Sequence, residues 1–191
     1  MIRHLLLSLF ILSTFVGCAQ STPQVNKAHY AQAVPSLQIE NLHKVDEKLY
    51  RSAQPSKSDF KRLYDFGIRY DLNLRQLHDD QEKLGDLPID YYRIPINTSK
   101  MRYEQLVEAV AYLIQTDGKT LVHCLHGSDR TGTVVAGYRI AVNGWSKEKA
   151  IDEFINGGFG YHTFWFPNLP KLLESINEEK FREDVRKYPL P

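Results

Sequence analysis

A cysteine and an arginine stand six positions apart in the segment His123–Gly132, and residues of these types at this spacing could bind and attack a tetrahedral oxyanion. The run Lys119–Val122 before it predicts a short buried strand, and the largely apolar stretch Thr131–Val142 after it predicts a buried helix. A loop between a strand end and a helix N-terminus points backbone N–H groups inward, with the positive end of the helix dipole behind them. Such a loop would hold a phosphate-like anion and would also stabilise a thiolate.

Cys124 is the candidate nucleophile of this loop. The pKa of a thiol at a helix N-terminus beside cations can fall from about 8.5 to between about 3.5 and 7.5. Arg130 could hold a phosphoryl group with two parallel hydrogen bonds, and Gly127 and Gly132 permit close approach of the backbone to phosphate oxygens. Thr131 could donate a hydrogen bond to the sulfur, cap the helix, or do both. The alternative for Cys124 is a buried structural cysteine, which would need neither the arginine nor the glycines.

The other side chains of the loop are predicted to contact substrate together with Arg130. They are Leu125, His126, Gly127, Ser128 and Asp129. A solvated loop histidine is the alternative interpretation of His126. His123 could keep the thiolate ionised through local hydrogen bonds, or it could be a hydrogen-bonded histidine of the core.

The order His-Cys, five residues, Arg-Thr resembles the signature of the cysteine-based phosphatases, and the chain is most similar to bacterial periplasmic dual-specificity tyrosine phosphatases. Flanking pieces carry the same resemblance in the expected order: Leu49–Ala53, Asn73–Arg75, Gly137–Ile140, Asn143–Trp145 and Gly157–Gly160. The resemblance implies a cysteine-phosphatase-like α/β fold. Arg51 and Arg75, within these pieces, could line the pocket or fix the loop by ion pairs. The aromatic run Phe159–Phe166 is expected in the core or a pocket wall, with stacking on substrate as an alternative.

The general acid departs from the pattern of these relatives, which usually carry an aspartate on a loop upstream of the cysteine. The corresponding segment here, Ile96–Arg102, has no carboxylate, and Glu104 is expected inside the next helix. Asp129 stands where some lipid-directed and myotubularin-like phosphatases have an aspartate, so we expect it to be the general acid. The alternative is that Asp129 only braces Arg130 or neighbouring amides.

These residues predict hydrolysis of phosphate monoesters through a phosphocysteine intermediate, with no cofactor and no metal. The expected substrate is a phosphorylated protein or small phosphoester, phosphotyrosine first and phosphoserine or phosphothreonine next. A lipid or inositol phosphate phosphatase is an alternative, disfavoured because the loop has no Lys or Arg before Arg130. A catalytically silent phosphate-binding module is a further alternative, and a sulfurtransferase fits the residues that flank the cysteine poorly.

The N-terminus has the pattern of an export signal. Arg3 is followed by the apolar run Leu5–Val16, which is too short to span a bilayer. The sequence Phe15–Cys18 then resembles the lipobox of bacterial lipoproteins. We therefore expect a signal peptide over residues 1–17, and an acylated Cys18 with a flexible tether over 18–36. The protein would then be periplasmic and anchored through lipid to the outer membrane. An ordinary cleaved secretory signal is the alternative.

The amino-acid composition limits the kinds of partner and of cross-link that we expect. Lys and Arg number 24 and Asp and Glu 23, without a basic run, which argues against binding nucleic acid. Only two cysteines are present, and both Cys18 and Cys124 already have a proposed role, so a structural disulfide is not expected. No cluster of His, Asp and Cys in the sequence suggests a metal.

From residue 37 onward, strand and helix patterns alternate. Strands are expected over Ile39–Val45, Lys48–Ser52, Ile68–Leu74 and Tyr91–Ile96. Helices are expected from Ser56 to Gly67, over Tyr103–Ile114, from Ser146 to Gly157, and in a final helix that begins near Pro170. The polar segment Asp79–Asp86 is expected to form a loop or a short surface helix. The alternation predicts one α/β domain over 37–191, with a central, mostly parallel sheet, helices on both faces, and the Cys124 loop at a strand's carboxyl end.

Overall fold

The computed structural model describes residues 27–190, which fold around a six-stranded sheet in the order β1-β2-β3-β6-β4-β5. The strands are β1 (Gln32–Ala33), β2 (His43–Lys44), β3 (Leu49–Ser52), β4 (Ile68–Arg75), β5 (Asp90–Ile96) and β6 (Lys119–His123). The pairs β3–β6, β6–β4 and β4–β5 are parallel, and the two short strands at one edge are antiparallel. The predicted mostly parallel sheet is confirmed.

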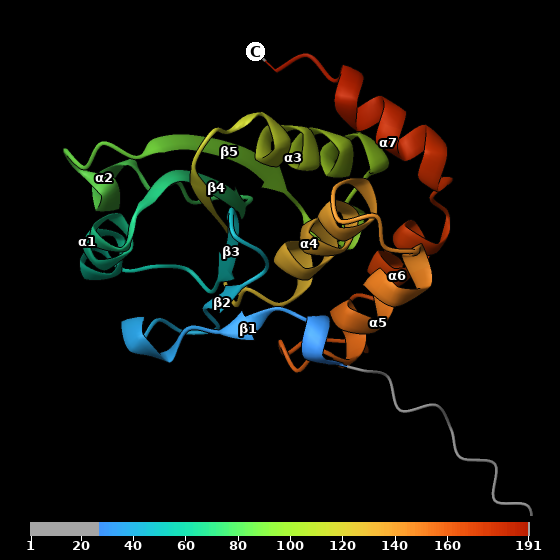
Figure 1. The fold of residues 1–191 in the computed structure, drawn as a ribbon, viewed down its shortest axis with the longest axis horizontal. Coiled ribbons are helices and arrows are strands. Elements are labelled where there is room, and N and C mark those ends of the chain that lie inside the picture. The colour runs from blue at the N-terminus through green and yellow to red at the C-terminus, as the bar shows by residue number, and fades with distance from the viewer. Residues whose placement is uncertain (1–26, 191) are drawn as a thin grey trace, which may run out of the picture.

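Helices cover both faces of this sheet (Figure 1). One face carries α1 (Lys57–Phe66) and α2 (Gln81–Leu84). The other carries α3 (Tyr103–Gln115), α4 (Asp129–Ala141), α5 (Lys147–Asn156), α6 (Asn168–Glu174) and α7 (Glu178–Lys187). Within residues 27–190, no helix has the length and apolar character needed to cross a bilayer. The α/β architecture with helices on both faces is confirmed.

Each face of the sheet has its own hydrophobic core, because successive strand residues point to opposite faces. In β6, Leu121 packs under α1 and α2 with Phe60 and Leu63. The next residue, Val122, belongs to the larger core under α3–α7 together with Val134. The central strands are therefore buried on both faces, as expected for parallel strands, and the loops at their carboxyl ends rest on a rigid base.

The N-terminal boundary of the domain differs from the prediction. β1 pairs with β2, Tyr30 and Ala31 are buried, and the Ala31 backbone N–H donates to a Glu153 carboxylate oxygen at 2.7 Å. Residues 27–36, expected in the tether, are thus packed on the domain, and a boundary at 37 is too late. The predicted signal peptide, Cys18 and the start of the tether lie outside the described residues.

Two further expectations about elements are corrected. The strand expected over Ile39–Val45 is reduced to β2, because Asn41 has the left-handed backbone conformation (φ 53°) and interrupts an extended run. The single final helix is in fact two, α6 and α7. The second was missed because only Phe181 and Val185 of α7 are buried, in an otherwise strongly charged segment.

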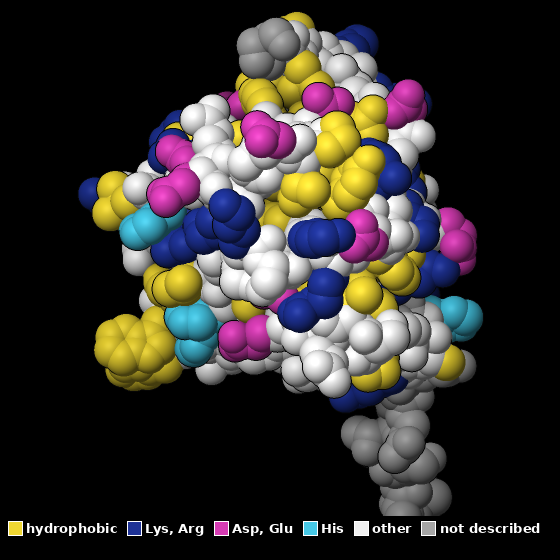
Figure 2. Space-filling view, turned by 90° about the vertical axis from the view of Figure 1, so that its left-hand side faces the viewer, with side chains coloured by type: hydrophobic (Ala, Val, Ile, Leu, Met, Phe, Trp, Pro, Cys, Tyr) yellow, Lys and Arg dark blue, Asp and Glu magenta, His cyan; other side chains and the backbone are white. Residues whose placement is uncertain are grey.

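Charge is mixed on the surface seen in Figure 2, where Asp and Glu side chains lie among Lys and Arg. No continuous basic face appears in this view, so it offers no support for a nucleic-acid partner.

Candidate active site

The Cys124 loop joins the end of β6 to the start of α4 and lies against the end of β3. Gly127 has φ +70°, and a Cβ atom at this position would lie 2.4 Å from the Ser52 carbonyl oxygen. Only glycine allows this backbone conformation and this close approach. α4 begins at Asp129, two residues before the expected start at Thr131, so Arg130 lies in its first turn.

Cys124 is buried at the bottom of this loop, 1% exposed. Burial by itself raises the pKa of its thiol, but the charge of Arg130, the Thr131 hydroxyl, and the Thr131 and Gly127 backbone amides together lower that pKa below the ordinary value. The buried Thr131 hydroxyl has no oxygen or nitrogen partner among the described residues, so its proton is available to the sulfur. The side chain is therefore prepared to react as a thiolate.

Arg130 is held by the ends of two strands. Its Nη1 donates to the carbonyl oxygens of Leu74, at 3.2 Å, and Ile96, at 3.3 Å, where β4 and β5 end. Its buried Nε has no hydrogen-bond partner among residues 27–190. The guanidinium is thus fixed in orientation, with a donor still available for an anion above the loop.

Arg51 braces the loop from below. It is fully buried, its Nη2 donates to the Gly127 carbonyl oxygen at 2.6 Å, and its guanidinium lies 4.0 Å from the centre of the Phe159 ring. Burial lowers its pKa to about 10, against the opposing charges of Glu153 and Cys124, so it is a cation at neutral pH. Of the two predicted roles, the structure favours fixing the loop, although through a carbonyl rather than an ion pair.

His123 is a second buried cation under the loop. Its Nε2 lies 3.3 Å from Asp71 Oδ1 and 3.1 Å from Asp80 Oδ2. Burial would lower the pKa of His123, but these two carboxylates raise it to about 10. His123 is therefore both a core histidine and a positive charge beside Cys124. Arg75 belongs to the same framework, since it donates to the Gln54 amide oxygen, and Gln54 in turn donates to Asp80.

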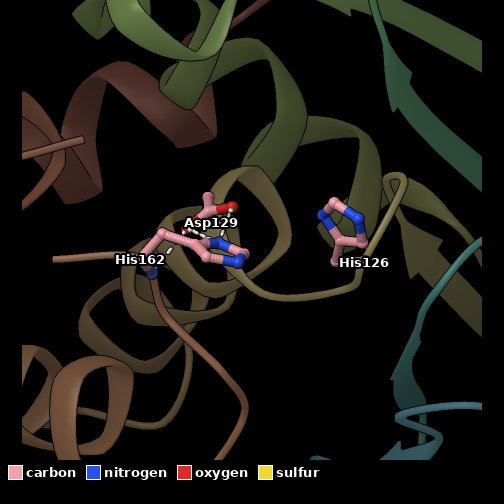
Figure 3. A group of neighbouring side chains, drawn as sticks. All are labelled: His126, Asp129 and His162. Carbon is pink, nitrogen blue, oxygen red and sulfur yellow. Dashed lines mark hydrogen bonds and ion pairs between the residues drawn. The ribbon is translucent and has the colours of Figure 1, made fainter. Parts of the chain in front are cut away.

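Asp129 is buried in the first turn of α4, and both of its oxygens are bound by one residue of the segment between α5 and α6. The backbone N–H of His162 donates to Oδ1 at 3.0 Å, and its ring Nδ1 lies 2.9 Å from Oδ2. The ring of His126, an exposed residue of the loop, lies 5.5 Å from the His162 ring (Figure 3). His162 was not among the residues predicted from the sequence.

Two groups of potential metal ligands are assembled by the fold, although the sequence alone showed none. One is His126, Asp129 and His162, and the other is Asp71, Asp80 and His123; within each, one ligand atom per residue lies within 4.8 Å of the others. In the first group Asp129 already accepts from the His162 ring, and in the second both carboxylates lie within ion-pair distance of His123 Nε2. Each group is accounted for by the contacts of its own side chains, so we assign neither group to a metal.

Comparison with known proteins gives the family. The model of the tyrosine phosphatase family matches residues 36–162, which include the whole Cys124 loop. The chain belongs to the tyrosine phosphatase family. The dual specificity protein phosphatase TpbA of Pseudomonas aeruginosa is 32% identical over 145 residues, which cover 74% of this chain and 65% of TpbA.

Solved structures agree with this family. A variant of Pseudomonas aeruginosa TpbA crystallised with phosphotyrosine superposes with a TM-score of 0.75 at 27% identity, over 85% of this chain and 99% of that one. The catalytic core of the PP-IP phosphatase SIW14 from Saccharomyces cerevisiae, crystallised with citrate, gives a TM-score of 0.66 at 22% identity over 78% and 93% of the two chains. At that identity the second likeness concerns the fold alone.

The aromatic run of the family segment is divided by the structure. Phe159 is buried under Arg51. The ring centre of Tyr161 lies 4.2 Å from that of Phe154, as expected of core residues. Phe164 and Trp165 are 84% and 70% exposed, so the prediction that they belong to the core is wrong for these two. Like His162, Asp71 was not predicted from the sequence, because its carboxylate meets His123 from the neighbouring strand β4, far away along the chain.

Proposed function

We propose that this member of the tyrosine phosphatase family hydrolyses phosphate monoesters through a phosphocysteine, with Cys124 as nucleophile. The observation that carries the proposal is the Cys124 thiol itself, buried in the loop with a lowered pKa beside Arg130. A buried structural cysteine would be expected to have a raised pKa.

In the first step, the Cys124 thiolate attacks phosphorus in line with the leaving oxygen, while the loop amides and Arg130 hold the equatorial oxygens. The S–P bond forms as the P–O bond breaks, and the leaving oxygen takes up a proton. Water then hydrolyses the phosphocysteine, and the Thr131 hydroxyl supports the departing sulfur. Leu125 and His126 are exposed residues of the loop and would contact the rest of the substrate, whereas Ser128 is buried.

The proposed substrate class is phosphotyrosine, with phosphoserine and phosphothreonine as further substrates. The support is the likeness to TpbA, named a dual specificity phosphatase and crystallised with phosphotyrosine. The test is a turnover screen of phosphotyrosine, phosphoserine and inositol phosphates. Faster turnover of inositol phosphates than of phosphotyrosine would show that inositol phosphates are the substrate class instead. Binding of phosphate without any turnover would identify a silent binding module.

The nucleophile is tested with Cys124→Ser, compared with wild type on p-nitrophenyl phosphate. Loss of the nucleophile lowers kcat by about 10⁶-fold in a well-studied serine protease, and we expect an effect of comparable size. Vanadate should still bind, because the amides and Arg130 remain. Turnover of the Cys124→Ser variant near the wild-type rate would end the phosphocysteine mechanism.

We further propose that the protein is exported and anchored to the outer membrane through lipid on Cys18, facing the periplasm. The support is the N-terminal sequence alone: the apolar run Leu5–Val16 and the lipobox-like Phe15–Cys18. Metabolic labelling with a fatty acid, compared between wild type and Cys18→Ala, is the test. Label is expected only on wild type, and an unlabelled wild type would indicate an ordinary secreted protein.

A further inference from the structure

His162 lies at the rim of the Cys124 loop, although it comes from the segment between α5 and α6. It is bound through its backbone N–H and its ring Nδ1 to the carboxylate of Asp129, which directly precedes Arg130. Its ring lies 5.5 Å from that of His126, two residues after the nucleophile. These contacts place the imidazole over the start of α4, at the edge of the loop that carries Cys124 and Arg130.

The hydrogen bond to Asp129 determines which ring nitrogen of His162 is available. A carboxylate only accepts, so Nδ1 carries the proton of this bond and Nε2 is the other end of the ring. In Figure 3 the second ring nitrogen is turned away from the carboxylate, toward the side on which His126 lies. The His162 side chain is 41% exposed and that of Asp129 8%, so the histidine, and not the aspartate, is accessible from solvent.

The segment in which relatives carry their acid cannot supply a proton here. Asn97 caps the short turn Thr98–Lys100, with its side-chain oxygen accepting from the Ser99 backbone N–H at 3.1 Å. A carboxamide has no proton to give near neutral pH. A general acid for this site must therefore come from another part of the fold.

We infer that His162 is the general acid of the phosphatase reaction, with Asp129 as the residue that positions it; this rests on the proposed phosphatase activity. As the sulfur of Cys124 bonds to phosphorus, the electron pair of the breaking P–O bond passes to the leaving oxygen. That oxygen takes the proton from Nε2 of the His162 imidazolium. In the second step the neutral imidazole accepts a proton from the attacking water, which restores the imidazolium as the S–P bond breaks.

The groups that face His162 support this assignment. They are the Asp129 carboxylate from α4, the His126 imidazole from the loop, and Tyr161, the preceding residue of the chain, whose hydroxyl donates to the Phe166 carbonyl oxygen. Asp129 is hydrogen-bonded directly to the His162 ring, whereas the centre of the His126 ring lies 5.5 Å from that of His162.

The experiment compares His162→Asn, Asp129→Asn and the double variant, with His78→Asn as control, an exposed histidine after β4. Each is assayed with p-nitrophenyl phosphate, a good leaving group, and with phosphoserine, a poor one. His162→Asn should lower phosphoserine turnover by about 10²- to 10⁴-fold, the usual size of general acid catalysis, and that of p-nitrophenyl phosphate far less. The basic limb of the phosphoserine pH profile should disappear, while its acidic limb, set by Cys124, persists.

Asp129→Asn should show the same preference for good leaving groups, and the double variant should be no slower than His162→Asn, because the two residues act as a unit. A selective loss in Asp129→Asn but not in His162→Asn would make Asp129 the direct donor and overturn the inference. Equal losses for both substrates would assign the pair a structural role and overturn it as well. If His162→Asn has a much lower melting temperature than wild type, His162→Gln is used in its place. A wild type inactive on every ester would instead refute the proposed function.

Discussion

The two ends of α4 each hold a buried or half-buried arginine, and the two differ in how completely their donors are used. At the C-terminal end, Arg139 forms a bidentate pair with Glu153, with both distances 2.8 Å. Its remaining nitrogen donates to the Val45 carbonyl oxygen, and its face stacks on Trp145 at 4.3 Å. At the N-terminal end, Arg130 has two long hydrogen bonds to carbonyl oxygens and a buried Nε without a protein partner in the described structure.

The difference indicates that Arg139 stabilises the fold, whereas Arg130 is available to bind an anion in the Cys124 loop. Glu153 also accepts from the Ala31 backbone, so the Arg139 pair joins the N-terminal segment to α4 and α5. Arg51 resembles Arg130 in this respect, with one hydrogen bond to the loop and two buried nitrogens lacking partners in residues 27–190. Unsatisfied buried donors are costly, and in native proteins they occur where another requirement retains them. Here that requirement is an anion and a thiolate in the loop.

The strongest test of this comparison exchanges each arginine for lysine. Arg130→Lys should lower kcat/KM by about 10³-fold or more, since an arginine that stabilises a phosphoryl transition state contributes about 10³- to 10⁵-fold and a point charge cannot replace its planar fork. Its melting temperature should change little. Arg139→Lys should do the opposite, with a lower melting temperature and nearly normal kcat/KM. Equal effects of the two variants on activity would contradict the separation.

Glu153→Gln removes the charge that satisfies Arg139. Breaking one partner of a buried ion pair costs about 3–5 kcal/mol in unfolding free energy, and we expect a loss in this range from urea unfolding followed by circular dichroism. Glu148→Gln, an exposed change on the same helix, is the control and should leave the unfolding midpoint in place. A midpoint for Glu153→Gln as high as that of the control would show that Arg139 finds other partners.

Arg51→Met removes the cation beneath the loop while keeping a side chain of similar length. We expect the pKa of Cys124 to rise, because Arg51 and the thiolate attract one another, and kcat/KM at neutral pH to fall by about 10²-fold, as for loss of one preorganised donor. The rate of alkylation by iodoacetamide as a function of pH measures the thiol pKa directly. An unchanged alkylation profile would limit Arg51 to packing.

The most gradual expected effect is a pH dependence of stability from His123. Its pKa is raised from 6.5 in the unfolded chain to about 10 by Asp71 and Asp80. Its contribution is therefore complete below pH 6.5 and is lost progressively as the pH rises to about 10. The slope of unfolding free energy cannot exceed about 1.4 kcal/mol per pH unit for one proton. His123→Gln should flatten this part of the curve, and an identical slope in both proteins would contradict the buried imidazolium.

The parts of the site that the sequence determined are those held by neighbouring residues. Cys124, Arg130 and Thr131 lie within one strand–loop–helix unit, so their types and spacing were enough to predict an anion loop with a cysteine in it. The same holds for most strands and helices, whose apolar periodicity is local. The last helix was missed because a segment with only two buried side chains has almost no periodicity to read.

What only the tertiary structure decided is the surroundings of that loop. Arg51 reaches the Gly127 carbonyl from 76 residues away, and His162 reaches Asp129 from 33 residues away. Neither spacing has meaning along the chain, since the contacts depend on β3 lying beside β6 and on the segment after α5 folding back over the start of α4. Sequence reasoning could therefore find the nucleophile and the lack of an upstream acid. The partner that fills that place became visible only when the chain was folded, because a hydrogen bond depends on distance in space.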